Sequence, residues 1–118
     1  MTNALATVSD APAAALATSV EIVGAWVSGR KATTTAAYRA DLGAFAGWLG
    51  QPGGEDAAAV LLGGGGSAAN RLAHAWRGEM IEQGLAPATV NRRLSALRSL
   101  VELAARLEAS GTGSFASR

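Results

Sequence analysis

The 118-residue sequence contains no cysteine and a single histidine, His74. Without cysteine, the chain has no disulfide, no cysteine-ligated zinc site and no thiol nucleophile. His74 has neither a second histidine nor a group of carboxylates with which to bind a metal. The acidic pairs Glu55–Asp56 and Glu79–Glu82 are explained as helix caps or solvated faces. We therefore expect no catalytic residue, no metal ligand and no cofactor in this chain.

Long apolar runs are also missing. No stretch approaches the roughly 18 consecutive apolar residues that a membrane-spanning helix requires. The first residues, "MTNALATVSDAPAAALATS", have neither the basic start nor the strong apolar centre of a signal peptide. We expect residues 1–18 to form a flexible N-terminal arm, and we expect a cytoplasmic protein with no membrane partner.

The composition allows one domain with a modest core, because 49% of the residues are hydrophobic and 16% are charged. The net charge is only +1, but the positive charge is unevenly distributed. Residues 30–50 carry three basic and one acidic side chain, and residues 91–118 carry five basic and two acidic ones. A fold that brings these two segments together makes a basic face.

Helical spacing of apolar residues extends over most of the chain, and no stretch alternates convincingly as a strand. We expect four amphipathic helices, over residues 19–29, 34–50, 67–83 and 87–109. Their expected N-terminal caps are Ser19, Thr33 or Thr34, and Ser67. Gly50 and Gly84 are expected to end the second and third helices. A short helix can form at 55–62, and Gly63–Gly66 is expected to be a flexible linker. The predicted fold class is all-α, a small four-helix bundle.

The expected helix 34–50 has two contrasting faces. Its apolar arc consists of Tyr38, Leu42, Phe45 and Leu49, with Asp41 and Trp48 at the edge. The opposite face, which is neither polar nor bulky, consists of Ala36, Ala40, Gly43 and Gly47. Another backbone can approach that face closely. The tryptophans are expected to pack in the core, because Trp26, Trp48 and Trp76 sit on or beside apolar stripes.

A polar and basic group lies on the expected helix 87–109. It consists of Asn91, Arg92, Arg93, Ser95, Arg98 and Ser99. Arginine can bind guanine or phosphate, asparagine can pair with adenine, and serine hydroxyls can bind phosphate. These side chains share the N-terminal half of one helix, where the backbone dipole favours an anion. On physical grounds two interpretations stay open, a helix that contacts DNA and a solvated basic face.

Two segments carry a family resemblance. The first, "TTTAAYRADLGAFAGWLG" at residues 33–50, has a threonine, a tyrosine three residues later, Asp-Leu, a phenylalanine and a tryptophan. The second, "GLAPATVNRRLSALRSLVELA" at residues 84–104, contains Gly-Leu, a proline, a threonine and then Arg-x-Leu-Ser-Ala-Leu-Arg. In this order and at this separation, they resemble the N-terminal core-binding (SAM-like) domain of tyrosine recombinases, the phage integrase family. The resemblance covers about residues 19–109.

The resemblance implies a DNA-binding domain whose second and fourth helices face the duplex. Position by position, it implies DNA-facing Thr35 and Arg39 on the second helix. On the fourth helix it implies Asn91, Arg92, Ser95, Arg98 and Ser99, and we add Arg93 from its place in the first turn. The expected partners are double-stranded DNA and other recombinase protomers on DNA, with a monomer expected off DNA.

The resemblance also implies that this chain is not an enzyme by itself. The family places strand exchange in a separate C-terminal domain with a nucleophilic tyrosine, and Tyr38 is not that residue. Residues 19–109 are then the DNA-binding domain, and residues 110–118 are a linker to a catalytic domain absent from this chain. The alternative is a helical module that binds another protein and not DNA.

Overall fold

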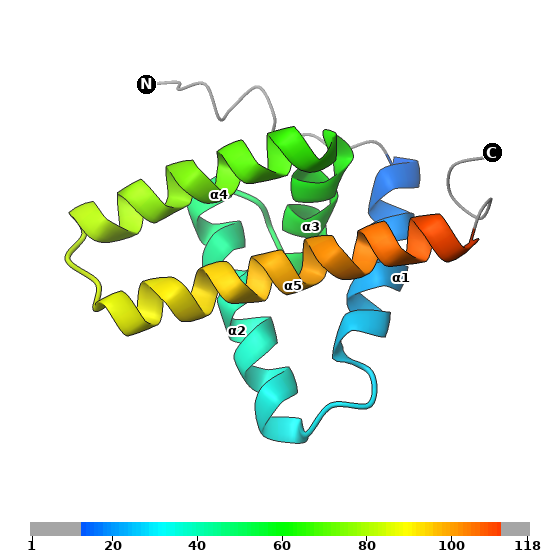
Figure 1. Ribbon diagram of the computed structural model, residues 1–118, viewed down its shortest axis with the longest axis horizontal. Coiled ribbons are helices and arrows are strands. Elements are labelled where there is room, and N and C mark those ends of the chain that lie inside the picture. Colours follow the sequence, from blue (N-terminus) through cyan, green and yellow to red (C-terminus); the bar gives the residue numbers. More distant parts are fainter. Residues whose placement is uncertain (1–12, 112–118) are drawn as a thin grey trace.

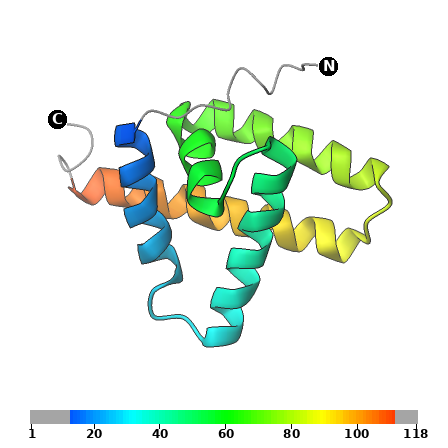
Figure 2. The same cartoon turned by 180° about the vertical axis from the view of Figure 1, so that it is seen from behind.

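In the computed structural model, residues 13–111 are described, and they form five α-helices. The helices are α1 (Ala13–Val27), α2 (Ala32–Leu49), α3 (Gly54–Gly63), α4 (Gly65–Glu82) and α5 (Pro87–Gly111). Helices α4 and α5 form an antiparallel pair, and the hairpin of α1 and α2 crosses behind α5 (Figure 1). The view from behind shows α3 between this hairpin and α4 (Figure 2). The predicted all-α helical bundle is confirmed.

Every helix contributes large apolar side chains to the core. Its most buried members include Trp26, Phe45, Leu61, Met80, Leu97 and Leu100. The Phe45 ring lies 5.0 Å from the Trp76 ring and 5.9 Å from the Trp48 ring, centroid to centroid. Trp26 and Trp76 are buried, and the half-buried Trp48 packs against the same core. The prediction that the three tryptophans are core residues is confirmed.

The short segment after α2 forms a helix of its own, α3. Ala57, Ala58 and Leu61 on this helix have no exposed surface. Only Gly64 separates α3 from α4, so the prediction of a flexible linker over Gly63–Gly66 was wrong. Glycine has low helix propensity, but burial of the apolar face of α3 stabilises the helix to its last turn.

Several predicted helix starts were wrong. Helix α1 begins at Ala13, so residues 13–18 are helical instead of belonging to the N-terminal arm. Ser19 is buried inside this helix, and its hydroxyl donates a 2.9 Å hydrogen bond to the Glu55 carbonyl. Helices α2 and α4 begin after Lys31 and Gly64, without a side-chain cap from the predicted threonines or Ser67. The alanine-rich start of α1 explains its extension, since alanine favours helix. Residues 1–12 and 112–118 of the predicted arm and linker lie outside the described residues.

Glycines in the left-handed conformation end α2 and α4, as predicted. Gly50 has φ 75°, and the Gln51 N–H donates to the Ala46 carbonyl at 2.9 Å. Gly84 has φ 81°, and the Leu85 N–H donates to the Met80 carbonyl at 3.2 Å. Side chains other than glycine rarely adopt this conformation. The turn at Gly84 directs α5 back along α4, which positions the polar face of α5 beside α4.

Candidate nucleic-acid interface

Three of the predicted DNA-binding side chains form a strip on the outer face of α5. Asn91, Ser95 and Arg98 follow the spacing i, i+4, i+7, which aligns them along one face of a helix. All three are exposed, and all three line an open groove between α4 and α5. The hydrogen bonds and salt bridges of the described residues leave their side chains without an intramolecular partner. Their donors are therefore available to a ligand.

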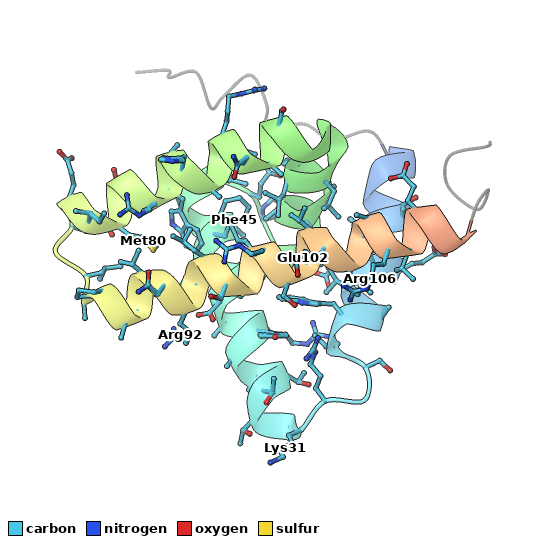
Figure 3. The ribbon with its side chains drawn as sticks, in the orientation of Figure 1. Lys31, Phe45, Met80, Arg92, Glu102 and Arg106 are labelled. Atoms are coloured by element: carbon cyan, nitrogen blue, oxygen red, sulfur yellow. The ribbon has the colours of Figure 1, made fainter. Side chains whose placement is uncertain are left out.

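Arg92 faces the other side of α5, where that helix crosses α2 (Figure 3). Its Nη2 and Nε donate hydrogen bonds of 2.8 and 3.2 Å to the two carboxylate oxygens of Asp41. The Asp41 side chain is buried, with 2% of its surface exposed, whereas 56% of the Arg92 side chain is exposed. A guanidinium carries five N–H groups, so this bidentate pair leaves others free to face outward. Arg92 both links α5 to α2 and keeps a solvent-facing cation.

The pairing with Asp41 also affects the pKa of Arg92. The hydrogen bonds to Asp41 raise the pKa of the Arg92 guanidinium above its ordinary value, and the Coulombic attraction of the carboxylate acts in the same direction. A raised pKa of a cation favours the protonated form in the folded state. Arginine is already protonated at physiological pH, so this shift adds to an existing preference for the charged form.

Ser99 lies on the same side of α5 as Arg92. Its hydroxyl oxygen accepts a 3.0 Å hydrogen bond from the indole N–H of the buried Trp26. The Trp26 ring stacks on Tyr38 with centroids 4.4 Å apart, and the Arg30 guanidinium lies 4.7 Å from the Tyr38 ring centroid. These contacts join α1, α2 and α5, and they account for Tyr38 as a packed residue.

Arg93 packs against α4 and, unlike the residues of the strip, does not line the groove. Its guanidinium carbon lies 5.9 Å from the Trp76 ring centroid, and Nη1 lies 4.0 Å from the Met80 sulfur. Its Nε is buried without a hydrogen-bond partner among the described residues. The Arg93 side chain thus packs against apolar residues of α4.

The two predicted DNA-binding residues on α2, Thr35 and Arg39, differ in how their side chains are engaged within the domain. The Thr35 hydroxyl donates a 3.2 Å hydrogen bond to the Val27 carbonyl and so holds the turn between α1 and α2. Arg39 lies 3.8 Å from Glu55, in an exposed pair that contributes little to stability. The outer face with Ala36 and Ala40 is exposed as predicted, and space is open beyond Gly43. The exposed outer side of α2 therefore offers a surface of small residues, and Arg39 is an exposed cation beside it.

The α4 side of the groove carries a second polar strip, which the sequence interpretation missed. Asn70, His74 and Arg77 are exposed, line the groove and repeat the spacing i, i+4, i+7. The groove between the two strips has a volume of about 770 Å³. The repeated spacing is present in the sequence, but only the packing of α4 beside α5 shows that these residues line a groove.

Residues 13–111 contain neither a metal site nor a membrane-spanning helix. No group of three histidine, aspartate or glutamate side chains lies close enough to hold a metal ion there. None of the described helices is both long and apolar enough to cross a bilayer. The described residues do form a polar helix face beside an open groove, in a small all-α domain.

Comparison with known proteins identifies the family. Residues 27–108 match the model of the phage integrase N-terminal SAM-like domain. This match covers all of α2, α3 and α4 and most of α5. The chain belongs to this family of domains, and the resemblance found in the sequence is confirmed.

A curated relative supports the same assignment. The chain is 39% identical over 79 residues to a tyrosine recombinase, Synpcc7942_B2651, of Synechococcus elongatus. The aligned part covers 66% of this chain but only 25% of that recombinase. The chain therefore corresponds to about a quarter of its relative. No solved structure matches the chain.

Proposed function

We propose that this chain is the double-stranded DNA-binding domain of a site-specific tyrosine recombinase and is non-catalytic by itself. The observation that carries the proposal is the exposed strip of Asn91, Ser95 and Arg98 on α5, the helix that the family resemblance assigns to DNA. Arginine, asparagine and serine are side chains that bind phosphates and base edges. Strand exchange would belong to a separate catalytic domain.

Helix α2 provides the second part of the proposed surface. Arg39 is half-exposed, and Arg92 presents its free N–H groups where α5 crosses α2. Both cations can approach a phosphate, and the Asp41 carboxylate holds Arg92 in a fixed orientation. The alanine and glycine face of α2 supports close approach to DNA but supplies few side-chain donors. In this proposal, α2 contributes affinity more than base selectivity.

The roles of the remaining predicted residues are narrower. Thr35 and Ser99 use their hydroxyls inside the domain, and Arg93 packs against Trp76. We propose that these three support the DNA-binding surface, and that Asn91, Ser95 and Arg98 make most of its direct contacts.

Titration of the chain into a fluorescently labelled duplex, followed by anisotropy at rising salt, tests the proposal. We expect a dissociation constant of roughly 10⁻⁴–10⁻⁶ M on an arbitrary sequence, with a salt slope equivalent to about 3–6 phosphates. The double variant Asn91→Ala/Arg98→Ala should bind more weakly and with a smaller slope. The parent chain failing to bind duplex even at low salt would overturn the proposal.

One observation favours a second candidate, a helical module that binds another protein. The exposed Ala36, Ala40, Gly43 and Gly47 give α2 a flat outer face against which a partner helix could pack. Sedimentation of the chain alone distinguishes the two candidates. We expect a monomer off DNA, whereas self-association without DNA binding would favour the protein-binding module.

A further inference from the structure

The groove between α4 and α5 has matching polar strips on its two walls. Asn70, His74 and Arg77 come from α4, and Asn91, Ser95 and Arg98 come from α5. Apolar residues, among them Ala73, Leu94 and Leu97, also line it. Each wall thus offers one arginine, one asparagine and one further polar side chain along a single face of its helix.

Because α4 and α5 are antiparallel, the two strips run in opposite directions along the groove. Helix α4 ends at the turn around Gly84 and α5 begins after it, so the two helices form an antiparallel pair (Figure 1). In such a pair, residues at equal sequence distances from the turn lie at about the same level. Arg77 then lies level with Asn91, and Asn70 lies level with Arg98. Each end of the groove therefore combines a guanidinium from one helix with a carboxamide from the other, and His74 and Ser95 lie between the ends.

The charges in the groove are not neutralised internally. Arg77 and Arg98 are both exposed, and neither forms a salt bridge with a described residue, unlike Arg39 and Arg92. Among the described residues that line the groove, Glu102 alone carries a carboxylate. It lies one turn beyond Arg98, away from Arg77. The groove is consequently cationic between its Arg77 and Arg98 ends and loses this character at Glu102.

Guanidinium, carboxamide and hydroxyl groups together are suited to phosphate oxygens. Seven residues separate the two arginine–asparagine ends on each helix, which corresponds to about 10 Å along the axis. A single small anion can occupy only one end. Successive phosphates of one strand, spaced about 3.4 Å along a duplex axis, can reach both ends over about three nucleotides.

We infer that the α4–α5 groove is a phosphodiester-binding groove that makes α4 a third nucleic-acid-binding helix beside α2 and α5. The inference rests on the proposed function and extends it to Asn70, His74 and Arg77. One strand of the nucleic acid lies along the groove, with phosphates at the Arg77 end and at the Arg98 end. Glu102 limits how far that strand continues toward the C-terminal half of α5.

The substitution Arg77→Ala tests the groove on a helix that the family resemblance does not assign to DNA. We expect about tenfold weaker binding to a labelled duplex and a salt slope lower by about one phosphate. The matched control is Arg71→Ala, which removes the same charge from the same helix outside the groove. The control should change the affinity by less than about twofold. Circular dichroism should show equal helix content and equal thermal midpoints for both variants.

Misfolding could explain weaker binding by Arg77→Ala, but it could not explain stronger binding, so a variant with stronger binding is a useful second test. Glu102→Gln removes the carboxylate from the groove, and we expect it to strengthen duplex binding by about twofold. Equal effects of Arg77→Ala and Arg71→Ala, with no gain from Glu102→Gln, would overturn the groove while leaving duplex binding intact.

A single-stranded oligonucleotide separates this inference from the proposed function. Binding of that probe that depends on Arg77, without binding of duplex, would support the groove and contradict the duplex-binding function. Binding of neither probe at low salt would overturn both.

Discussion

On the side of α5 that faces α1 and α2, Arg92 is bonded to Asp41 and Ser99 to Trp26. On the side that faces α4, Asn91 and Arg98 have the same kinds of polar group but no intramolecular bond to a described residue. One helix therefore carries two polar surfaces with different uses. The first surface holds α5 against the α1–α2 hairpin and leaves only the remaining N–H groups of Arg92 exposed. The second surface leaves all of its donors open to a ligand.

The difference follows from burial. Asp41 and Trp26 lose nearly all contact with water, so each needs a hydrogen-bond partner, and the nearest polar side chain on α5 provides one. The buried polar side chains among the described residues are Ser19 and Asp41, and neither lines the groove. An exposed arginine without a partner stays hydrated and contributes little to stability. Its removal should therefore affect ligand binding more than folding. The two sides should thus respond differently to substitution.

Trp26→Ala should have the largest effect on stability. It removes a fully buried indole, its stacking on Tyr38 and its bond to Ser99. We expect a loss of about 3–5 kcal/mol in the free energy of unfolding, measured by urea denaturation. Arg77→Ala, on the open side, is the comparison and should stay within about 0.5 kcal/mol of the parent. Similar losses for both substitutions would show that the two sides do not differ.

Asp41→Asn should have the next largest effect. The asparagine is nearly isosteric, but it replaces one carboxylate oxygen with an N–H₂ group that faces the Arg92 donors. We expect a loss of about 2 kcal/mol in the free energy of unfolding. Glu102→Gln makes the same chemical change on an exposed part of α5 and should alter stability by less than about 0.5 kcal/mol. An unchanged Asp41→Asn variant would mean that the pair with Arg92 does not stabilise the crossing of α2 and α5.

Arg98→Ala should separate binding from folding. We expect about tenfold weaker duplex binding by anisotropy, with an unfolding midpoint equal to that of the parent. Arg92→Ala should instead lower the unfolding midpoint, because it leaves the buried Asp41 carboxylate without its partner. The reverse pattern, in which Arg98→Ala lowers the unfolding midpoint and leaves binding unchanged, would contradict the assignment of the two surfaces.

Ser99→Ala should produce the smallest of these changes. It removes the acceptor of the Trp26 indole N–H, and we expect a loss of about 1 kcal/mol in the free energy of unfolding. The control is Ser95→Ala, the same substitution one turn earlier on the exposed face, which should not destabilise the helix. Equal stabilities of the two variants would show that the hydrogen bond between Trp26 and Ser99 does not stabilise the fold.

The sequence predicted the fold class well because apolar periodicity and terminal glycines act locally. The stripe with Leu42 and Phe45 and the left-handed Gly84 were both recognisable without tertiary information. The capping residues were not predictable in this way. Ser19 became a buried bridge to α3 because α1 extends beyond it, and that extension depends on packing between helices.

The candidate site was only partly predictable for a similar reason. The sequence placed Asn91, Ser95 and Arg98 in one polar group on this helix. Arg92 and Ser99 belonged to the same group, and the sequence alone did not separate them from the exposed strip. Their partners Asp41 and Trp26 lie more than fifty residues away in the sequence, as the hydrogen bonds show. The α4 strip could be recognised only from the fold, because the turn at Gly84 brings Arg77 into the same groove as Asn91.

Titration of ¹⁵N-labelled chain with duplex DNA, followed by NMR, observes both sides of α5 in one experiment. The side-chain amide signal of Asn91 and the Nε–H signal of Arg98 should shift as DNA is added. The indole N–H signal of Trp26, which is buried and bonded to Ser99, should stay close to its free position. Large shifts of the Trp26 signal, with the Asn91 and Arg98 signals unmoved, would contradict the division between a structural side and a DNA-binding side.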